Sequence, residues 1–435
     1  MYNKNSVWNK DQVRPKFETL THDMKTDVLI IGGGITGLLC AYKLKNAGVN
    51  CVLVEADKIC SGITKNTTAK ITVQHGLIYD KMIKTMGQEA ASLYYKANND
   101  ALKEFFNLSK NIKCDFEEKE AFVYGTENFD EIKREAGALN KIGCPVILKE
   151  KTELPLSDIL AVGIPNQAQF HPLKFCFGIA KELPIFENTK VLELGENFAV
   201  TNRAKINFKK VIVATHFPFI NKHGFYFAKL YQHRSYVLAL KNVPRISGMY
   251  VDSDLKGLSF RNYSDFLLLG GGGHRTGKRG GGWQQLEEFA IKNFQGVKII
   301  NRWATQDCMS LDSIPYIGQY SKNTPNMFTA TGFNKWGMTS SMVSATVLCD
   351  LVQEKGNEFA DLFSPSRSVL KPQLAVNLGE SLVGVLNLKT PRCPHLGCAL
   401  KYNSAEHSWD CSCHGSRFTK DGKLIDNPAI DDIKL

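Results

Sequence analysis

Two short segments near the C-terminus place cysteine and histidine at spacings that suit metal chemistry. Cys393 and His395 lie in the first segment, and Cys411 and His414 lie in the second, with fifteen residues between His395 and Cys411. Thiolate sulfur and neutral imidazole nitrogen are strong ligands for soft and borderline metals. A β-hairpin of this length would present both segments at one end, so the four side chains can meet around one metal group.

Two metal groups fit these residue types. In a Rieske [2Fe–2S] cluster two thiolates hold one iron and two imidazoles hold the other, which raises the reduction potential above that of a four-cysteine cluster. Tetrahedral zinc is the alternative, because zinc also binds cysteine and histidine. The Cys-x-His spacing is awkward for zinc, and each segment carries one further cysteine, Cys398 and Cys413. The sequence therefore predicts a Rieske cluster.

A glycine-rich segment near the N-terminus has the pattern of a dinucleotide-binding loop. Gly32, Gly34 and Gly37 follow an apolar run and open a helical pattern. The first glycine permits the turn, the second lets the backbone approach a pyrophosphate, and the third lets helix and strand pack closely. The helix N-terminus attracts the phosphates. Glu55, 18 residues after Gly37, is placed to accept hydrogen bonds from the ribose hydroxyls.

The glycine loop alone does not distinguish FAD from NAD. A second glycine turn at 332–337 precedes a helical pattern and could face a flavin ring, and a separate fingerprint for nicotinamide is missing. The glycine run at 270–277 follows a strand but precedes no apolar-periodic helix. We expect that run to form a loop over the active cleft.

Alternating strands and helices are expected to position these residues. Short apolar runs and helical patterns near the glycine loop predict a parallel sheet, and two later runs predict a second sheet. The predicted strands of the first sheet lie at 27–31, 49–55, 209–215 and 327–332, its helices at 38–45 and 340–354, and the strands of the second sheet at 236–240 and 266–269.

Several of these segments resemble flavoenzymes of the D-amino-acid oxidase and glycine oxidase type. The resemblance rests on 27–55, 60–70, 211–215 and 331–339, and 67–75 is similar to the subset with a C-terminal Rieske domain. It implies FAD as the cofactor and an α/β fold with three domains. These are a Rossmann-like FAD-binding domain (1–80, 155–225 and 300–362), a mixed-sheet substrate domain (81–154 and 226–299) and, after a linker at 363–378, a small all-β Rieske domain (379–435).

The resemblance also implies which residues contact FAD. They come from the glycine loop, the strand after it, the segment at 60–70, and the ends of later strands. The predicted set is Gly32, Gly34, Ile35, Thr36, Gly37, Glu55, Ala56, Gly62, Thr64, Thr67, Thr68, Ala69, Lys70, Val191, Ala214, Thr215, Gly332, Gly337, Met338 and Thr339.

Candidate substrate groups are fewer. Lys335 falls near the position where glycine-oxidase-like enzymes place a carboxylate-binding arginine, and Arg261 lies on the predicted second sheet. We predict these two as the catalytic residues. Other polar side chains of that sheet or its loops are weaker candidates, namely His233, Arg234, Tyr263 and Arg275.

The match to Rieske proteins of respiratory chains adds three expectations. Cys398 and Cys413 occupy the positions of a loop-to-loop disulfide in those proteins. Ser416 occupies the position of a hydroxyl donor to the cluster, whereas Phe418 replaces a tyrosine donor, so we expect a reduction potential below the respiratory type. About 20 residues separate the linker from Cys393, fewer than the usual strands need, and we expect 382–388 to supply one strand of a shortened domain.

Composition narrows the class of protein. The net charge is +11, but lysine and arginine are scattered without a run of five, so we expect no nucleic-acid partner. No apolar stretch reaches the ~18 residues of a membrane span, and residues 1–20 contain no apolar signal-peptide core. The cytoplasm is the expected location. The eight cysteines outside the metal segments are expected to be mostly buried fillers, although Cys60 lies close to the FAD loop.

Together these features predict an FAD-dependent oxidoreductase. A flavin accepts two electrons as hydride and a [2Fe–2S] cluster carries one, so we expect a small substrate, with an amine or amino acid implied by the resemblance. The partner would be a protein or small-molecule electron acceptor or donor. Two alternatives remain: an electron-transfer or redox-sensing protein without its own small substrate, and an oxidase with a structural zinc site.

Overall fold

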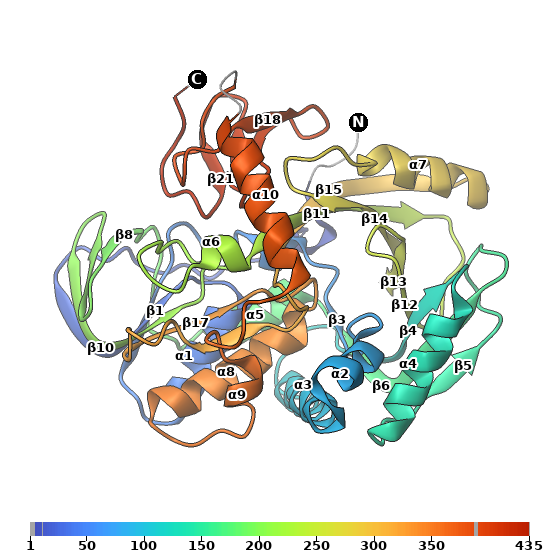
Figure 1. The fold of residues 1–435 in the computed structure, drawn as a ribbon, viewed down its shortest axis with the longest axis horizontal. Coiled ribbons are helices and arrows are strands. Elements are labelled where there is room, and N and C mark those ends of the chain that lie inside the picture. The colour runs from blue at the N-terminus through green and yellow to red at the C-terminus, as the bar shows by residue number, and fades with distance from the viewer. Residues whose placement is uncertain (1–4, 11, 387–389, 435) are drawn as a thin grey trace.

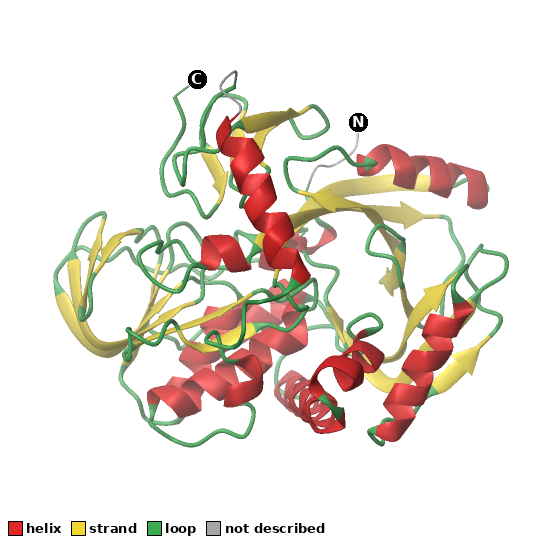
Figure 2. Cartoon of the chain, viewed as in Figure 1, coloured by secondary structure: helices red, strands yellow, loops and turns green. Residues whose placement is uncertain are grey.

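The computed structural model describes residues 5–10, 12–386 and 390–434. Two large sheets lie side by side, and a small third sheet near the C-terminus lies across their upper edge (Figure 1). Most helices gather in the lower half of the view, and two long helices, at 282–293 and 372–386, lie in its upper half beside strands and loops (Figure 2). The expected α/β fold with a small all-β C-terminal domain is confirmed.

The first sheet contains the glycine loop. β1 pairs in parallel with β10 and β2, and its apolar run divides between two cores. Val28 and Ile30 pack toward the helices, while Leu29 and Ile31 pack on the other face. The strands in order are β16 (Tyr316–Gln319), β17 (Met327–Thr331), β10 (Lys205–Val213), β1 (Met24–Ile31), β2 (Cys51–Val54) and β7 (Ile185–Phe186), with β8 (Val191–Leu194) and β9 (Phe198–Thr201) as a flanking hairpin.

The second sheet is mixed and has nine strands. β11 pairs with β14 on one side and with β15 on the other, antiparallel in both cases. The strands in order are β15 (Lys298–Met309), β11 (Tyr231–Lys241), β14 (Phe266–Arg275), β13 (Ser259–Tyr263), β12 (Met249–Asp252), β4 (Glu117–Gly125), β6 (Leu160–Gln169) and β3 (Lys70–Ile71), and β5 (Ile147–Lys149) pairs with β6.

The helices cover these sheets and connect them. α1 and α8 pack against each other on the first sheet, and both belong to the main hydrophobic core. The helices are α1 (Ile35–Asn46), α2 (Ile78–Met86), α3 (Gln88–Ser109), α4 (Phe129–Lys141), α5 (Pro172–Ala180), α6 (Tyr226–Lys229), α7 (Gly282–Asn293), α8 (Gly337–Val352), α9 (Ala360–Phe363) and α10 (Pro372–Leu386), with 3-10 turns at Val7–Asn9 and Ile63–Asn66.

One expectation about these elements is wrong. The glycine run at 270–277 is not a loop, because residues 270–275 continue strand β14 and pair mainly with β11. The structure also places β3, β6 and β15 in the second sheet, and the domain ranges 1–80, 155–225 and 300–362 stay a prediction. Strand pairing of this kind depends on long-range hydrogen bonds, which local sequence patterns do not encode.

The C-terminal domain is a four-stranded antiparallel sheet preceded by a helix. β18 (Leu400–Asn403), β19 (Ser408–Cys411), β20 (Arg417–Thr419) and β21 (Leu424–Asp426) follow one another as a meander. The strand expected at 382–388 is wrong where the structure describes it, because 382–386 are the end of helix α10, and 387–389 lie outside the described residues. Alternating small and apolar residues fit both periods, which explains the error.

Helix α10 turns a small and polar face inward. Asn377 and Gly384 are buried, whereas Leu382 and Val383 are more than half exposed. A Cβ at Gly384 would lie 2.5 Å from the sulfur of Cys413, so glycine lets the helix approach the cysteine-rich loops closely. This helix runs from the body of the molecule up to the C-terminal sheet (Figure 1).

A buried ionic network fastens the C-terminal sheet to strand β11. Arg234 of β11 donates two hydrogen bonds to Glu406, and Arg417 of β20 donates to the same carboxylate at 2.8 Å. Arg417 also donates to Asp410 at 3.0 Å and to Asp426 at 3.1 Å. The network is shielded from solvent, with Arg234 only 3% exposed, so each charge depends on its partners.

No helix within the described ranges combines the length and the apolar character that crossing a membrane requires.

The ionic network yields a prediction about stability. Glu406→Gln would leave the buried guanidinium groups of Arg234 and Arg417 without their shared carboxylate and lower the free energy of unfolding by about 3 kcal/mol. Glu358→Gln, in the exposed ion pair with Lys96, is the matched control and is expected to cost less than about 1 kcal/mol. Urea titrations of both variants test this, and equal midpoints would contradict it.

Candidate active site and metal centre

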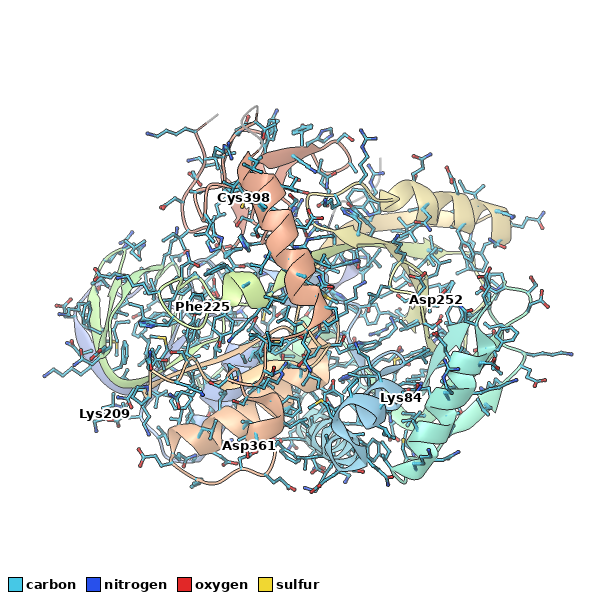
Figure 3. All side chains as sticks on the ribbon, viewed as in Figure 1. Lys84, Lys209, Phe225, Asp252, Asp361 and Cys398 are labelled. Atoms are coloured by element: carbon cyan, nitrogen blue, oxygen red, sulfur yellow. The ribbon has the colours of Figure 1, made fainter. Side chains whose placement is uncertain are left out.

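A large cavity lies between the two sheets and extends to the C-terminal domain. Its volume is about 1150 Å³, above the ~300–1,000 Å³ of ordinary small-molecule pockets. The glycine loop lines one end, and strand ends of the second sheet line the other, including Asp252 of β12, which Figure 3 marks. The cavity therefore has room for a dinucleotide together with a smaller molecule.

The glycine loop has the geometry that a pyrophosphate requires. Gly32 has a φ of +111°, which favours glycine. A Cβ at Gly37 would lie 1.9 Å from the carbonyl oxygen of Gly32, so any larger residue would push helix α1 off the loop. The N-terminus of α1 opens on the cavity through Gly34 and Ile35. These residues fit a bound dinucleotide.

Glu55 lies at the end of β2, where the sequence placed it. Its carboxylate accepts hydrogen bonds from the backbone N–H groups of Gly33 at 2.7 Å and Asp57 at 2.9 Å. Burial raises the pKa of Glu55, and these N–H groups oppose that shift. The carboxylate lines the cavity and is positioned by backbone, which suits recognition of ribose hydroxyls.

Most of the predicted FAD contacts lie on the cavity wall. All but Gly37, Ala69, Gly332 and Thr339 line it. Gly37 and Ala69 shape the backbone, with Ala69 at a φ of +54°, and Thr339 hydrogen-bonds the ring of His75 at 3.0 Å. The roles of the individual residues remain predictions, and the cavity places them along one continuous surface.

Sequence reasoning missed several parts of the wall. His75 stacks on Trp336 with ring centroids 5.0 Å apart, and both line the cavity. His216 also lines it, and burial lowers its pKa to about 4, opposed by Asp426 and Gln232. Residues of the C-terminal domain between 424 and 432 line it as well. His75 and Trp336 lie within segments that the sequence analysis singled out, at 67–75 and 332–337, whereas no local motif marks His216 or residues 424–432, which only the packing of distant segments brings to the cavity.

The end of the cavity away from the glycine loop carries a polar cluster. Lys335 and Asp307 line it, and His233 is the direct cross-strand partner of Asp307. Burial raises the pKa of Asp307 to about 6, opposed by Lys335 and Arg234. Burial and Lys335 lower the pKa of His233 to about 3 and leave its ring neutral. Lys335 donates to the carbonyl of Leu255 at 3.2 Å.

The structure separates the two predicted catalytic residues. Lys335 faces the cavity, but Arg261 is not part of its lining and is 1% exposed. The Arg261 guanidinium donates to the carbonyls of Thr68 at 2.6 Å and Ala69 at 2.9 Å, so it braces the backbone of the predicted FAD loop. Backbone carbonyls thus engage part of the Arg261 guanidinium, and its role toward substrate stays a prediction.

Three weaker candidates also serve elsewhere. Arg234 belongs to the ionic network on β11, and Tyr263 packs edge-on against Trp8. Arg275 donates to the carbonyls of Ser412 and Cys413, each at 3.1 Å. Two of the three thus hold the C-terminal domain in place rather than facing the cavity.

The four predicted metal ligands converge at the tips of the C-terminal sheet. The Nδ1 atoms of His395 and His414 lie 3.2 Å apart, with both ring centroids separated by 4.8 Å. Cys393 and Cys411 are buried and hydrogen-bonded to each other. His414 is buried as well, and His395 is half-buried. Two imidazoles and two thiols match the donor set of a Rieske cluster.

The protonation states of three of the four predicted ligands suit metal binding. Hydrogen bonds from Cys393, Cys398 and Cys413 hold the pKa of the Cys411 thiol well below its ordinary value. Burial lowers the pKa of His395 to about 3 and also lowers that of His414. The hydrogen bond to Cys411 and burial raise the pKa of the Cys393 thiol instead. Metal ligands must be thiolates and neutral imidazoles, so these shifts favour the ligand form of Cys411 and of both histidines, whereas Cys393 has to lose its proton when the metal binds.

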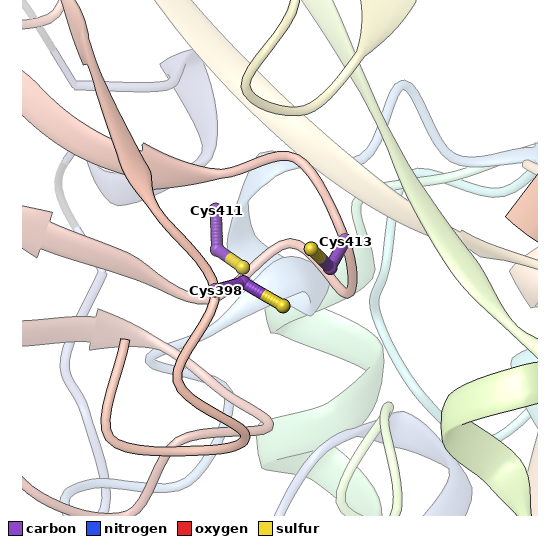
Figure 4. A group of neighbouring side chains, drawn as sticks. All are labelled: Cys398, Cys411 and Cys413. Atoms are coloured by element: carbon purple, nitrogen blue, oxygen red, sulfur yellow. The ribbon is translucent and has the colours of Figure 1, made fainter. Parts of the chain in front are cut away.

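The two remaining cysteines lie beside the ligands. The sulfurs of Cys398, Cys411 and Cys413 are all within 4.8 Å of one another and point toward a common centre (Figure 4). The structure holds them as free thiols. A Cys398–Cys413 disulfide stays a prediction, and their proximity would permit it.

The loop after Cys411 is seated on strand β11. Gln232 donates to the carbonyls of His414 at 3.0 Å and Asn427 at 2.8 Å. Gln306 of β15 donates to the carbonyl of Gly415 at 2.9 Å and to the side-chain oxygen of Gln232 at 2.6 Å. The side chain of Gln232 thus holds the backbone of His414, one of the predicted metal ligands. His233, the next residue of β11, points to the opposite face of the strand, toward the cavity.

Comparison with known proteins identifies the class. Residues 27–351 match the family described as DAO, FAD dependent oxidoreductase, and residues 369–435 match the Rieske [2Fe-2S] domain. The chain belongs to the DAO family of FAD-dependent oxidoreductases and carries a C-terminal Rieske domain. It is an enzyme that binds FAD and a [2Fe–2S] cluster, as the sequence predicted.

Individual relatives are similar to all or most of the chain. The chain is 36% identical to the "Putative Rieske 2Fe-2S iron-sulfur protein YhfW" of Bacillus subtilis (strain 168) over 494 residues, covering 99% of this chain and 97% of that protein. In fold it is similar to glycine oxidase from Geobacillus kaustophilus (TM-score 0.67, 19% identity, 79% of this chain and 99% of that chain). L-proline dehydrogenase from P. horikoshii is equally similar (TM-score 0.67, 17% identity, 79% and 98%).

The surroundings of the cluster ligands predict its reduction potential. The Ser416 hydroxyl hydrogen-bonds the sulfur of Cys393, whereas the buried Phe418 has no donor to offer. We expect a potential below about +250 mV, near the top of the Rieske range. Phe418→Tyr should raise it and Ser416→Ala should lower it, each by on the order of 60 mV, a tenfold change for one electron. A redox titration monitored by visible absorption measures these potentials, and a wild-type reduction potential above that limit would contradict the expectation.

The raised pKa of Asp307 leads us to expect that the stability of the protein depends on pH. Its pKa of about 6 in the folded chain exceeds the ordinary value of 3.8, so the folded state holds the proton more tightly. Stability should therefore fall as pH rises from about 4 to about 6. Asp307→Asn removes this loss and should stabilise the protein above pH 6 by about 1–2 kcal/mol, after allowance for partial exposure to the cavity.

Melting curves of this variant at pH 4.5 and pH 7.5 provide the test. The control is Asp361→Asn, at an exposed position of α9 that Figure 3 marks. If Asp307→Asn kept the wild-type difference between the two pH values, the assignment of this titration to Asp307 would be wrong.

Proposed function

We propose that the protein oxidises a small amine or amino acid at FAD and exchanges single electrons with a further acceptor through the Rieske cluster. When bound, FAD supplies a two-electron acceptor and the cluster a one-electron carrier. The substrate would lose two electrons and become an imine, and the acceptor would take them up one at a time.

The polar cluster of the cavity supports a small substrate with charged groups. Lys335 can hold a substrate carboxylate in place, because its ammonium group faces the cavity. Asp307 and the neutral ring of His233 lie beside it. The pKa of about 6 leaves Asp307 able to release or take up a proton near neutral pH, which suits deprotonation of a substrate ammonium group.

The single observation that carries the proposal is that the paired strands β11 and β15 contribute side chains to the cavity from one face and to the Rieske domain from the other. Tyr231, Ser235 and Asp307 line the cavity. Gln232 and Gln306, from the alternate positions of the same strands, hold the loop that contains His414. Side chains alternate between the two faces of a strand, so only the thickness of one sheet separates the cavity from the cluster loop.

A protein without a small substrate is the second candidate. Such a protein would need a flavin edge open to a docking partner. The walls of the cavity instead come from both sheets and from the C-terminal domain, and its far end is polar. This enclosure favours the first candidate. The names of the structural relatives, glycine oxidase and L-proline dehydrogenase, also favour an amino acid substrate.

Anaerobic mixing with candidate amino acids and amines tests the proposal. Bleaching of the flavin absorption, followed by the EPR signal of a reduced Rieske cluster, is the expected result. Flavin bleaching without a cluster signal would exclude the exchange of electrons between the centres. If no amine or amino acid bleached the flavin while a reduced protein partner did, the second candidate would replace the first.

Lys335 provides a sharper test of substrate binding. Lys335→Met should raise KM for a carboxylate-bearing substrate by about 10- to 100-fold, because a charge-assisted hydrogen bond is lost. Lys335→Arg should recover most of the affinity. Lys256→Met is the matched control, since this neighbouring lysine is exposed and outside the cavity lining. Steady-state kinetics of the three variants would contradict the role if all had the same KM.

A further inference from the structure

One wall of the FAD cavity comes from the Rieske domain. The segment from Leu424 to Asp432 follows the last cluster-loop strands, and seven of its residues line the cavity. Glu55, Ala56 and Lys190 line the same cavity from the first sheet. FAD-binding loops and the end of the Rieske domain therefore face the same space.

Direct hydrogen bonds join this segment to the FAD-binding half. The side chain of Asn427 donates to the carbonyls of Thr215 at 2.6 Å and Phe217 at 2.8 Å, just beyond strand β10. The ammonium group of Lys190 donates to the carbonyl of Ile430. These contacts span from the predicted FAD residue Thr215 to the turn before Val191, so the segment lies along the cavity rather than touching it at one point.

The same segment is tied to the cluster loop. The N–H of Ala429 donates to the hydroxyl of Ser416 at 3.0 Å, and Gln232 donates to the carbonyls of both His414 and Asn427. Asp426 is held by Arg417 of the ionic network. Its negative charge is thereby neutralised, which permits the segment to lie near an anionic dinucleotide.

We propose that residues 424–432 of the Rieske domain form part of the FAD site and close it at the end marked by Glu55 and Lys190. The Rieske domain then holds FAD in place in addition to carrying electrons. Release of FAD requires this segment to move away from Thr215 and Lys190. A relative with the FAD domain alone would lack this closure.

Hydrogen exchange of the full chain, with its cluster loaded, tests the proposal directly. Exchange is compared between the protein with FAD and the same protein after FAD has been removed. Backbone amides within 424–432 should exchange at least about tenfold more slowly with FAD bound. The hairpin β18–β19 lies in the same domain and contributes no residue to the cavity lining, so its exchange should stay unchanged. Equal exchange of 424–432 in both forms would overturn the proposal.

A pair of alanine substitutions tests the closure itself. Asn427→Ala removes the two hydrogen bonds to the β10 loop and should speed FAD dissociation by about tenfold, measured by recovery of flavin fluorescence on dilution. Asp431→Ala, at an exposed position of the same segment outside the cavity lining, should dissociate at the wild-type rate. The cluster absorption of both variants is recorded alongside.

The FAD release rate and the cluster absorption of the Asn427→Ala variant together test the proposal. Faster FAD release in Asn427→Ala with unchanged cluster absorption supports the proposal, and wild-type release in that variant overturns it. If Asn427→Ala also lost its cluster, the proposal would be tested by the hydrogen exchange of residues 424–432 in the wild-type chain with and without FAD. None of these measurements depends on the substrate, so failure here would leave the proposed amine oxidation standing, and failure of amine oxidation would leave the closure of the FAD site standing.

Discussion

The alternation of side chains along β11 and β15 is the constraint on which the rest of the structure depends. A strand sends successive side chains to opposite faces, so one pair of strands can serve two sites. Ser235 and Asp307 face the cavity, while Gln232, Arg234 and Gln306 reach the Rieske domain. A shift of one residue in the pairing of these strands would exchange the two faces and disrupt both sites at once.

Buried charged groups have different roles on the two faces of strands β11 and β15. Toward the Rieske domain, Arg234, Glu406 and Arg417 satisfy one another, and the network specifies one docking geometry. Toward the cavity, burial raises the pKa of Asp307 and lowers that of Lys335. Shifted groups of this kind are expected where a site binds and reacts with a ligand.

The Rieske domain is compact, and its neighbours complete it. Gly384 of α10 lies against Cys413, Gln232 and Gln306 hold the loop at His414, and Asn427 reaches the loop after β10. Packing on the flavoprotein supplies walls that a free-standing domain would have to build from its own strands.

The sequence by itself determined the chemistry that local spacing encodes. The metal site could be predicted because ligand type and loop spacing are local features, which identify Cys393, His395, Cys411 and His414. The dinucleotide loop at 32–37 could be predicted because a tight turn accepts few residue types. Tertiary structure alone decided that Arg261 braces a loop, that β3, β6 and β15 join the second sheet, and that seven residues between 424 and 432 line the FAD cavity. These facts depend on hydrogen bonds and packing between segments far apart in the chain, for which no local pattern exists.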